Sequence, residues 1–87
     1  MLLPLNMAML KFFTSGKEAT REDVQESLRA DYGNLKAFSD KSMDEALQTA
    51  FSNGLIAESR MELVDGRLKV YYQADGDMIN TINSYVK

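Results

Sequence analysis

The chain has 87 residues, 45% hydrophobic and 26% charged, which is typical of one soluble globular domain. It has neither cysteine nor histidine, which excludes disulfides and cysteine-based zinc sites and removes the commonest general base. The net charge of -3 is unusual for a dedicated nucleic-acid binder, although a local basic patch can suffice. We therefore treat residues 1–87 as a single domain, expect no cofactor or bound metal, and expect a cytoplasmic protein.

The N-terminal segment predicts a helix from about Pro4 to Phe13, because proline is well tolerated in a first helical turn. The segment is too short to span a membrane and lacks the features of a signal peptide. It is apolar on nearly all sides, which leaves two alternatives: a central core helix or a homodimer contact. The dimer alternative would use Leu2, Leu3, Met7 and Leu10.

A second helix is predicted to begin after Thr20, whose hydroxyl and the carboxylate of Asp23 have the spacing of a capping box. Gly33-Asn34 is expected to end it, since both residues tolerate left-handed backbone. Ala19-Thr20 is a candidate for a short extra strand before this helix.

A third helix is predicted to begin at Ser42, with Glu45 completing a second capping box. Leu35 and Phe38, in the preceding link, are expected to be anchored in the core. Gly54 ends the helix. Its apolar stripe at helical spacing is Met43, Ala46, Leu47, Ala50 and Phe51.

Asp65-Gly66 predicts a two-residue type I′ turn, and therefore a hairpin. The predicted pairs are Val64–Arg67, Leu63–Leu68, Glu62–Lys69, Met61–Val70, Arg60–Tyr71 and Ser59–Tyr72. This register places one apolar set on the core face and sets Glu62 against Lys69 and Arg60 against Tyr71 on the other. We expect the former to be a surface ion pair and the latter a cation–π pair. The expected core face is Met61, Leu63, Leu68, Val70 and Tyr72.

A last helix is expected between Asp75, its cap, and Lys87. Its predicted apolar face is Met78, Ile79, Ile82, Tyr85 and Val86. The order is three helices, a two-stranded hairpin and a C-terminal helix, which is an α+β arrangement and the plan of a winged helix-turn-helix domain.

The chain resembles the PadR-like winged-helix transcription regulators. The resemblance is carried by Gly54-Leu55-Ile56, by Gly66-Arg67 and by the Tyr71-Tyr72 end of the second strand. Ala74 and Asp75 stand where the family has leucine and threonine. Membership would imply a homodimer on double-stranded DNA, with the third helix in the major groove and the wing against the backbone or minor groove.

The family's DNA contacts lie at the start of the third helix and at the wing tip. The resemblance therefore places Lys41, Ser42, Gln48, Thr49, Arg67 and Lys69 at the DNA, next to Asp44 and Glu45. Lys36, just before the helix, adds a further candidate for a phosphate contact.

The sequence thus predicts a small DNA-binding transcription regulator. The alternative is a winged-helix module that binds another protein through the N-terminal helix and methionines, without DNA. The acidic composition and the Asp44-Glu45 pair favour this alternative. No nucleophile–base pair, phosphate loop or metal-ligand spacing is evident, so we do not expect an enzyme.

Overall fold

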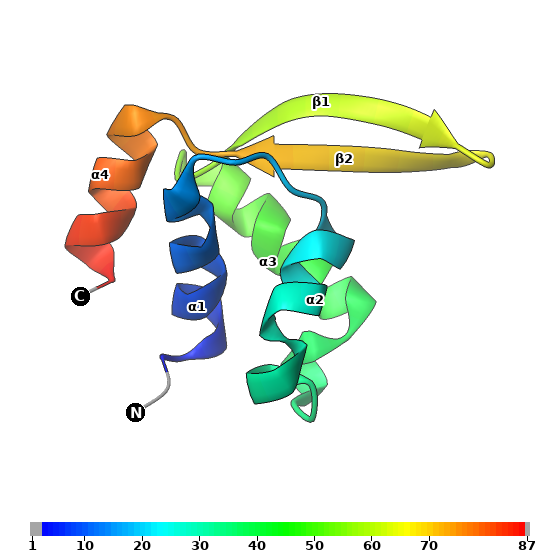
Figure 1. Cartoon of the computed structure of the whole chain (residues 1–87), viewed down its shortest axis with the longest axis horizontal. Helices are drawn as coiled ribbons and strands as arrows, with labels where there is room; N and C mark the ends of the chain where they lie inside the picture. The colour runs from blue at the N-terminus through cyan, green and yellow to red at the C-terminus, as the bar shows by residue number, and fades with distance from the viewer. Residues whose placement is uncertain (1–2, 87) are drawn as a thin grey trace.

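The computed structural model describes residues 3–86, which form an α+β fold. In the cartoon, the α-helices lie together under one half of an antiparallel hairpin, and the other half projects beyond them (Figure 1). The predicted α+β class and element order are confirmed. The elements are α1 (Leu5–Phe12), η1 (Phe13–Ser15), α2 (Arg21–Tyr32), η2 (Lys36–Phe38), α3 (Asp40–Ser52), β1 (Ala57–Val64), β2 (Arg67–Gln73) and α4 (Gly76–Tyr85).

The start of α2 has the predicted capping box. The backbone N–H of Asp23 donates to Thr20 Oγ1 at 3.2 Å, and the backbone N–H of Thr20 donates to Asp23 Oδ2 at 3.0 Å. Both bonds satisfy donors that the first helical turn leaves without intrahelical partners. The spacing of Thr20 and Asp23 in the sequence was therefore sufficient to locate the start of α2.

The predicted start of α3 is wrong by three residues. Ser39 is the N-cap, and its Oγ accepts a hydrogen bond from the backbone N–H of Ser42 at 3.3 Å. The earlier start puts Phe38 and Met43 at the two positions that a hydrophobic staple joins, and both are buried in the same core. Ser42 is consequently inside the first turn, and Glu45 is an exposed residue of the helix rather than a capping partner.

Gly33 follows α2 but does not take the left-handed conformation that we expected, since its φ is -58°. Its N–H instead continues the helical pattern by donating to Arg29 O at 2.9 Å. A Cβ at this position would lie 2.6 Å from the same oxygen. Gly33 is therefore needed for close backbone approach.

The hairpin turn is type I′ as predicted, with φ of 50° at Asp65 and 77° at Gly66. The register is confirmed for five pairs, from Val64–Arg67 to Arg60–Tyr71. The predicted Ser59–Tyr72 pair is wrong, because a bulge at Ser59 lets Glu58 pair with Tyr72. The extra strand at Ala19 is a single bridge, with N–H···O bonds of 2.9 and 2.8 Å to and from Tyr72.

The core lies between the helices and the base of the hairpin, where Phe13, Val24, Met43, Leu47 and Ile82 are fully buried. Leu35 and Tyr85 were expected in the core but are 50% and 63% exposed. Phe51, at 38%, lies at the edge of its helical stripe.

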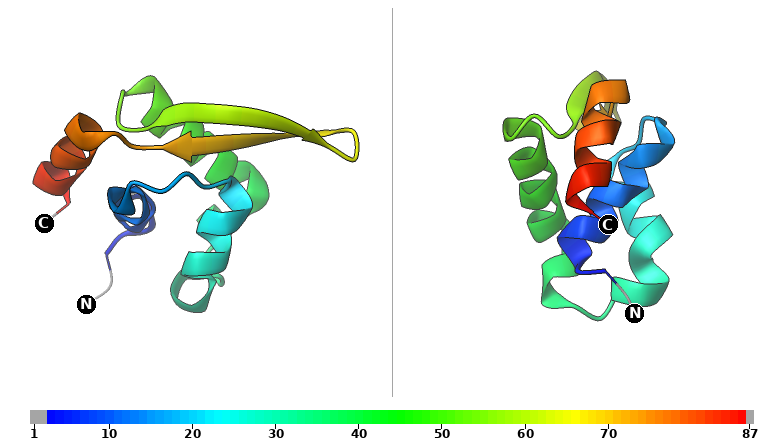
Figure 2. Two further views of the ribbon diagram at one scale, coloured as in Figure 1. Left: turned by 45° about the horizontal axis from the view of Figure 1, so that its top comes forward. Right: turned by 90° about the vertical axis from the view of Figure 1, so that its left-hand side faces the viewer.

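The apolar face of the hairpin is buried only at its base. Tyr72 is buried and Val70 is half-buried, whereas Met61, Leu63 and Leu68 are 54%, 76% and 63% exposed. The expectation that all five form part of the core is therefore wrong. The reason is visible in the turned views, where the hairpin lies across one end of the helices and its outer half has no helix beneath it (Figure 2).

Helix α1 is mainly a core helix. Leu10 is 6% exposed, and Leu3 and Met7 are half-buried against the same core. Leu2 lies outside the described residues. Less apolar surface therefore remains for the predicted dimer contact than the sequence suggested. Between residues 3 and 86, no helix is both long enough and apolar enough to cross a membrane.

Candidate nucleic-acid interface

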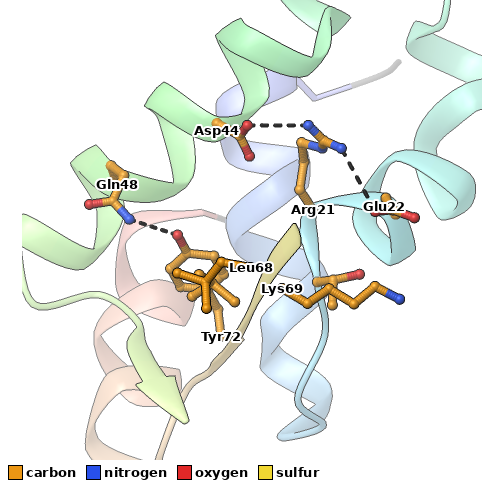
Figure 3. A pocket seen from close by; sticks show the side chains of 9 residues that line it. Arg21, Glu22, Asp44, Gln48, Leu68, Lys69 and Tyr72 are labelled. Atoms are coloured by element: carbon orange, nitrogen blue, oxygen red, sulfur yellow. Dashed lines mark hydrogen bonds and ion pairs between the residues drawn. The ribbon is translucent and has the colours of Figure 1, made fainter. Parts of the chain in front are cut away.

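Part of the exposed surface of α3, around Gln48, lies next to strand β2 of the hairpin. Along α3, Lys41, Gln48 and Thr49 are exposed, and Ser42 is half-buried in the first turn. Gln48 borders a hollow of about 260 Å³ that is enclosed by α3, the start of α2 and strand β2. The residues that line it are Thr20, Arg21, Glu22, Asp44, Gln48, Leu68, Lys69, Val70 and Tyr72 (Figure 3).

The structure brings only some of the predicted DNA-contacting residues together. Gln48 and Lys69 line the same hollow, and Arg67 lines an adjoining one that Lys69 shares. Thr49 instead lines a groove with residues of α1 and α4. Lys36 is in η2, within the α2–α3 connection, which lies at the opposite end of the helices from the hairpin (Figure 1). Lys36 and Lys69 therefore belong to separate surfaces.

Arg21 is the central residue of the hollow. Its Nη1 lies 3.2 Å from Asp44 Oδ2 and 3.8 Å from Asp40 Oδ2, and its Nη2 lies 3.9 Å from Glu22 Oε1. The guanidinium reaches from α2 toward α3 (Figure 3). It supplies positive charge next to Asp40 and Asp44, and the third acid of α3, Glu45, is exposed.

Sequence reasoning missed Arg21. An arginine in the first turn of a helix opposes the helix dipole, and this unusual position beside Glu22 and Asp23 was the available signal. The Arg21 side chain is 23% exposed, and its Nε is buried without a partner among residues 3–86. The guanidinium is thus held mainly through its two terminal nitrogens.

Gln48 is oriented by the base of the hairpin. Its Nε2 donates a hydrogen bond of 2.8 Å to the phenol oxygen of Tyr72 (Figure 3). Burial raises the pKa of Tyr72, and the bond from Gln48 opposes part of that effect. The Gln48 amide keeps its carbonyl oxygen and a second N–H available for a ligand, which is the donor–acceptor pattern that reads an adenine edge.

A second charged cluster lies on the other face of the hairpin. Arg60 Nε is 2.8 Å from Glu18 Oε1, and Arg60 Nη1 is 2.9 Å from Glu62 Oε1. The Arg60 guanidinium carbon lies 3.9 Å from the ring centre of Tyr71, which confirms the expected cation–π pair. The hydrogen bond from Arg60 lowers the pKa of Glu18, and the hydrogen bond from Tyr71 is the main cause that lowers the pKa of Glu62.

This cluster changes the role of Lys69. Glu62 and Lys69 are opposite each other as predicted, but within the described part of the chain the ion pair of Glu62 is with Arg60. The expected Glu62–Lys69 ion pair is therefore wrong. Lys69 still lines the hollow, and its side chain extends from β2 in the direction away from α3 (Figure 3).

The described residues contain no cluster of acids that could hold a metal ion. Comparison with known proteins gave no match to a family model, to a curated protein or to a solved structure. The functional argument therefore rests on the geometry of α3, the hollow and the hairpin.

Proposed function

We propose that the chain is a winged-helix domain that binds double-stranded DNA and acts as a transcription regulator. The observation that carries the proposal is the exposed side of α3 next to a projecting hairpin, with Arg21 balancing Asp40 and Asp44. Without that arginine, the helix would present a row of acids to phosphates. With it, two of these acids are partly balanced, and the exposed Lys41 on α3 and Lys69 at the hollow are candidates for phosphate contacts.

The order of the elements supports the same proposal. The Ala19 bridge to Tyr72 adds a minimal third strand to the hairpin, and α3 precedes the hairpin as a recognition helix precedes a wing. In this arrangement α3 would enter the major groove, with Gln48 reading base edges. Arg67 and Lys69 would contact phosphates from the hairpin. Two such domains would occupy an operator with two-fold symmetry.

The test is a fluorescence-anisotropy titration of a labelled random duplex at increasing salt. Three phosphate contacts would give a slope of log K against log[salt] of roughly -3. We expect Lys41→Ala to weaken binding to all sequences and to reduce the slope by about 1. Lys11→Ala is the matched control, because Lys11 is also an exposed lysine but lies on α1.

The proposal would be wrong if the duplex showed no affinity at low salt and no salt dependence. It would also fail if Lys11→Ala and Lys41→Ala weakened binding equally, because the affinity would then be general charge attraction without a defined surface.

A second candidate is a winged-helix module that binds another protein and not DNA. The specific observation in its favour is the exposed apolar surface of Met61, Leu63 and Leu68, since exposed apolar patches mark interaction sites. The net charge of -3 also agrees with it. This candidate predicts no salt-dependent DNA binding in the titration above.

A further inference from the structure

The outer edge of β1 has no partner strand. The sheet contains only β1 and β2 among residues 3–86, and β2 is met on its other side by Ala19 at Tyr72. The views show no other segment alongside the outer half of β1 (Figures 1 and 2). An edge strand of this kind presents unpaired N–H and C=O groups that a further strand can bind.

The turn determines which backbone groups point outward. In a two-residue hairpin the pair that flanks the turn is hydrogen-bonded, and such pairs then alternate with non-bonded pairs. Val64–Arg67 and Glu62–Lys69 are therefore bonded within the hairpin, whereas Met61 and Leu63 direct their N–H and C=O groups outward. The bulge at Ser59 ends this regular edge.

The edge carries few of the features that normally prevent strand addition. Strand β1 contains no proline and no lysine. Its charged residues are Glu58, Arg60 and Glu62, which alternate in sign along the strand. Arg60 and Glu62 are on the face opposite Met61 and Leu63. Met61 and Leu63 are 54% and 76% exposed.

We propose that a second copy of this chain binds the β1 edge in antiparallel orientation, with the two-fold axis through Met61. In this register Arg60 lies opposite Glu62 of the partner subunit, and Glu62 lies opposite Arg60 of the partner subunit. The Met61 side chains of the two copies meet at the axis on the apolar face. The product is a four-stranded sheet with charge-complementary pairs on one face and a continuous apolar row on the other.

Neighbouring registers are less favourable. An axis through Glu62 places that carboxylate against Glu62 of the partner subunit, and like charges directly opposite each other are destabilising. An axis through Leu63 places Met61 opposite Asp65 of the partner subunit, which belongs to the turn and not to a strand. The alternating charges therefore select the Met61 register.

The contact is small, because the regular edge spans only a few residues on each side of Met61. Interfaces below about 1,200 Å² are usually weak, so we expect a concentration-dependent dimer. The inference does not depend on DNA binding, since the edge and the α3 hollow are different surfaces.

The first test exchanges the charges and measures association by sedimentation equilibrium. Position 60 of each copy lies opposite position 62 of the other. Glu62→Arg therefore makes both of these pairs positive, and Arg60→Glu makes both of them negative. Each variant alone should raise the dimer dissociation constant about tenfold or more. An equimolar mixture of the two should associate about as well as the unaltered protein, because its opposing charges are complementary again.

Arg60→Glu also removes the contact to Glu18, so circular dichroism melting must first show that each variant is folded. If either variant is unfolded, Met61→Lys replaces the pair and should give a monomer. The inference is overturned if the unaltered protein is a monomer at the highest concentration reached. It is also overturned if both single variants associate as well as the unaltered protein.

The second test uses the absence of cysteine from the sequence. Met61→Cys places one thiol from each copy at the axis, so mild oxidation should give a covalent dimer. Leu68→Cys is the matched control, because Leu68 is 63% exposed against 54% for Met61 but lies on β2, away from the edge. Preferential cross-linking of Leu68→Cys would contradict edge pairing and indicate that the apolar faces stack.

Discussion

The helical body and the outer half of the hairpin are stabilised by different physics. In the body, Leu47 and Phe13 are fully buried among side chains from several elements. In the outer hairpin, Leu63 and Leu68 face each other across the strands but remain 76% and 63% exposed. The body is held by burial of apolar surface, and the hairpin by its turn, its backbone ladder and cross-strand pairs.

This contrast means that the apolar character of a side chain does not by itself show whether that side chain is buried, because burial also depends on which elements cover it. The hairpin register correctly sorted side chains between two faces, yet it did not reveal that the helices end before the outer half of that face. The base is different, because Tyr72 is buried and accepts a hydrogen bond from Gln48. The boundary between the buried base and the exposed outer half of this face lies near the half-buried Val70.

The largest expected effect compares two leucines. Leu47→Ala removes buried methyl groups and should lower the free energy of unfolding by about 2–5 kcal/mol, which approaches the total stability of a small domain. Leu63→Ala should change it by no more than about 0.5 kcal/mol. Denaturant unfolding followed by circular dichroism measures both. Similar losses in the two variants would mean that the outer hairpin is covered in solution.

An intermediate effect is expected at the turn. Gly66→Ala puts a side chain at a φ of 77° with no atom within 4 Å, so its cost of about 1 kcal/mol is purely conformational. Amide exchange should accelerate in β1 and β2 while the body stays protected. Gly76→Ala is the control, because the site is equally open and has no left-handed φ. Faster exchange throughout the body would show that hairpin and body unfold together.

The smallest effect concerns Glu18 at the base of the hairpin. Arg60 holds the pKa of Glu18 below its ordinary value of 4.5, so this contact stabilises the fold above that pH and is lost as the pH falls through the lowered pKa. Arg60→Gln should move the Glu18 titration midpoint, measured by NMR, upward toward 4.5. Arg67→Gln, at the far end of β2, should leave the midpoint unchanged. An unchanged midpoint in Arg60→Gln would remove the assigned cause.

The sequence predicted those parts of the fold that depend on neighbours along the chain. The Thr20–Asp23 capping box and the Asp65-Gly66 turn each require only a few residues, and both are confirmed. Ser39 and Ser42 both fit a cap by local rules, and the choice depended on burying Phe38, which is a tertiary effect. Local pattern could therefore find the helix but not its first residue.

The candidate site was less accessible to prediction because its main contact joins residues that are distant in sequence. Arg21 and Asp44 are 23 positions apart, and neither has a spacing that indicates the pair. The same holds for Gln48 and Tyr72, which are 24 positions apart. Glu62 was predicted to form a surface ion pair with Lys69, and only the structure shows that its ion pair is with Arg60. After the hydrogen bond from Tyr71, which is the main cause, Lys69 also contributes to the lowered pKa of Glu62.

Because Arg21 of α2 pairs with Asp40 and Asp44 of α3, substitutions in the two helices should be epistatic in their effect on the surface charge of α3. The same substitution on α3 will have different consequences depending on a residue of α2, because Asp40 and Asp44 share one guanidinium. Changing Asp44 alone leaves Arg21 to Asp40 and Glu22, whereas changing Arg21 exposes all three carboxylates to one another. Sequence variation at positions 21, 22, 40 and 44 should therefore be interpreted jointly, as a single four-residue unit with its own net charge.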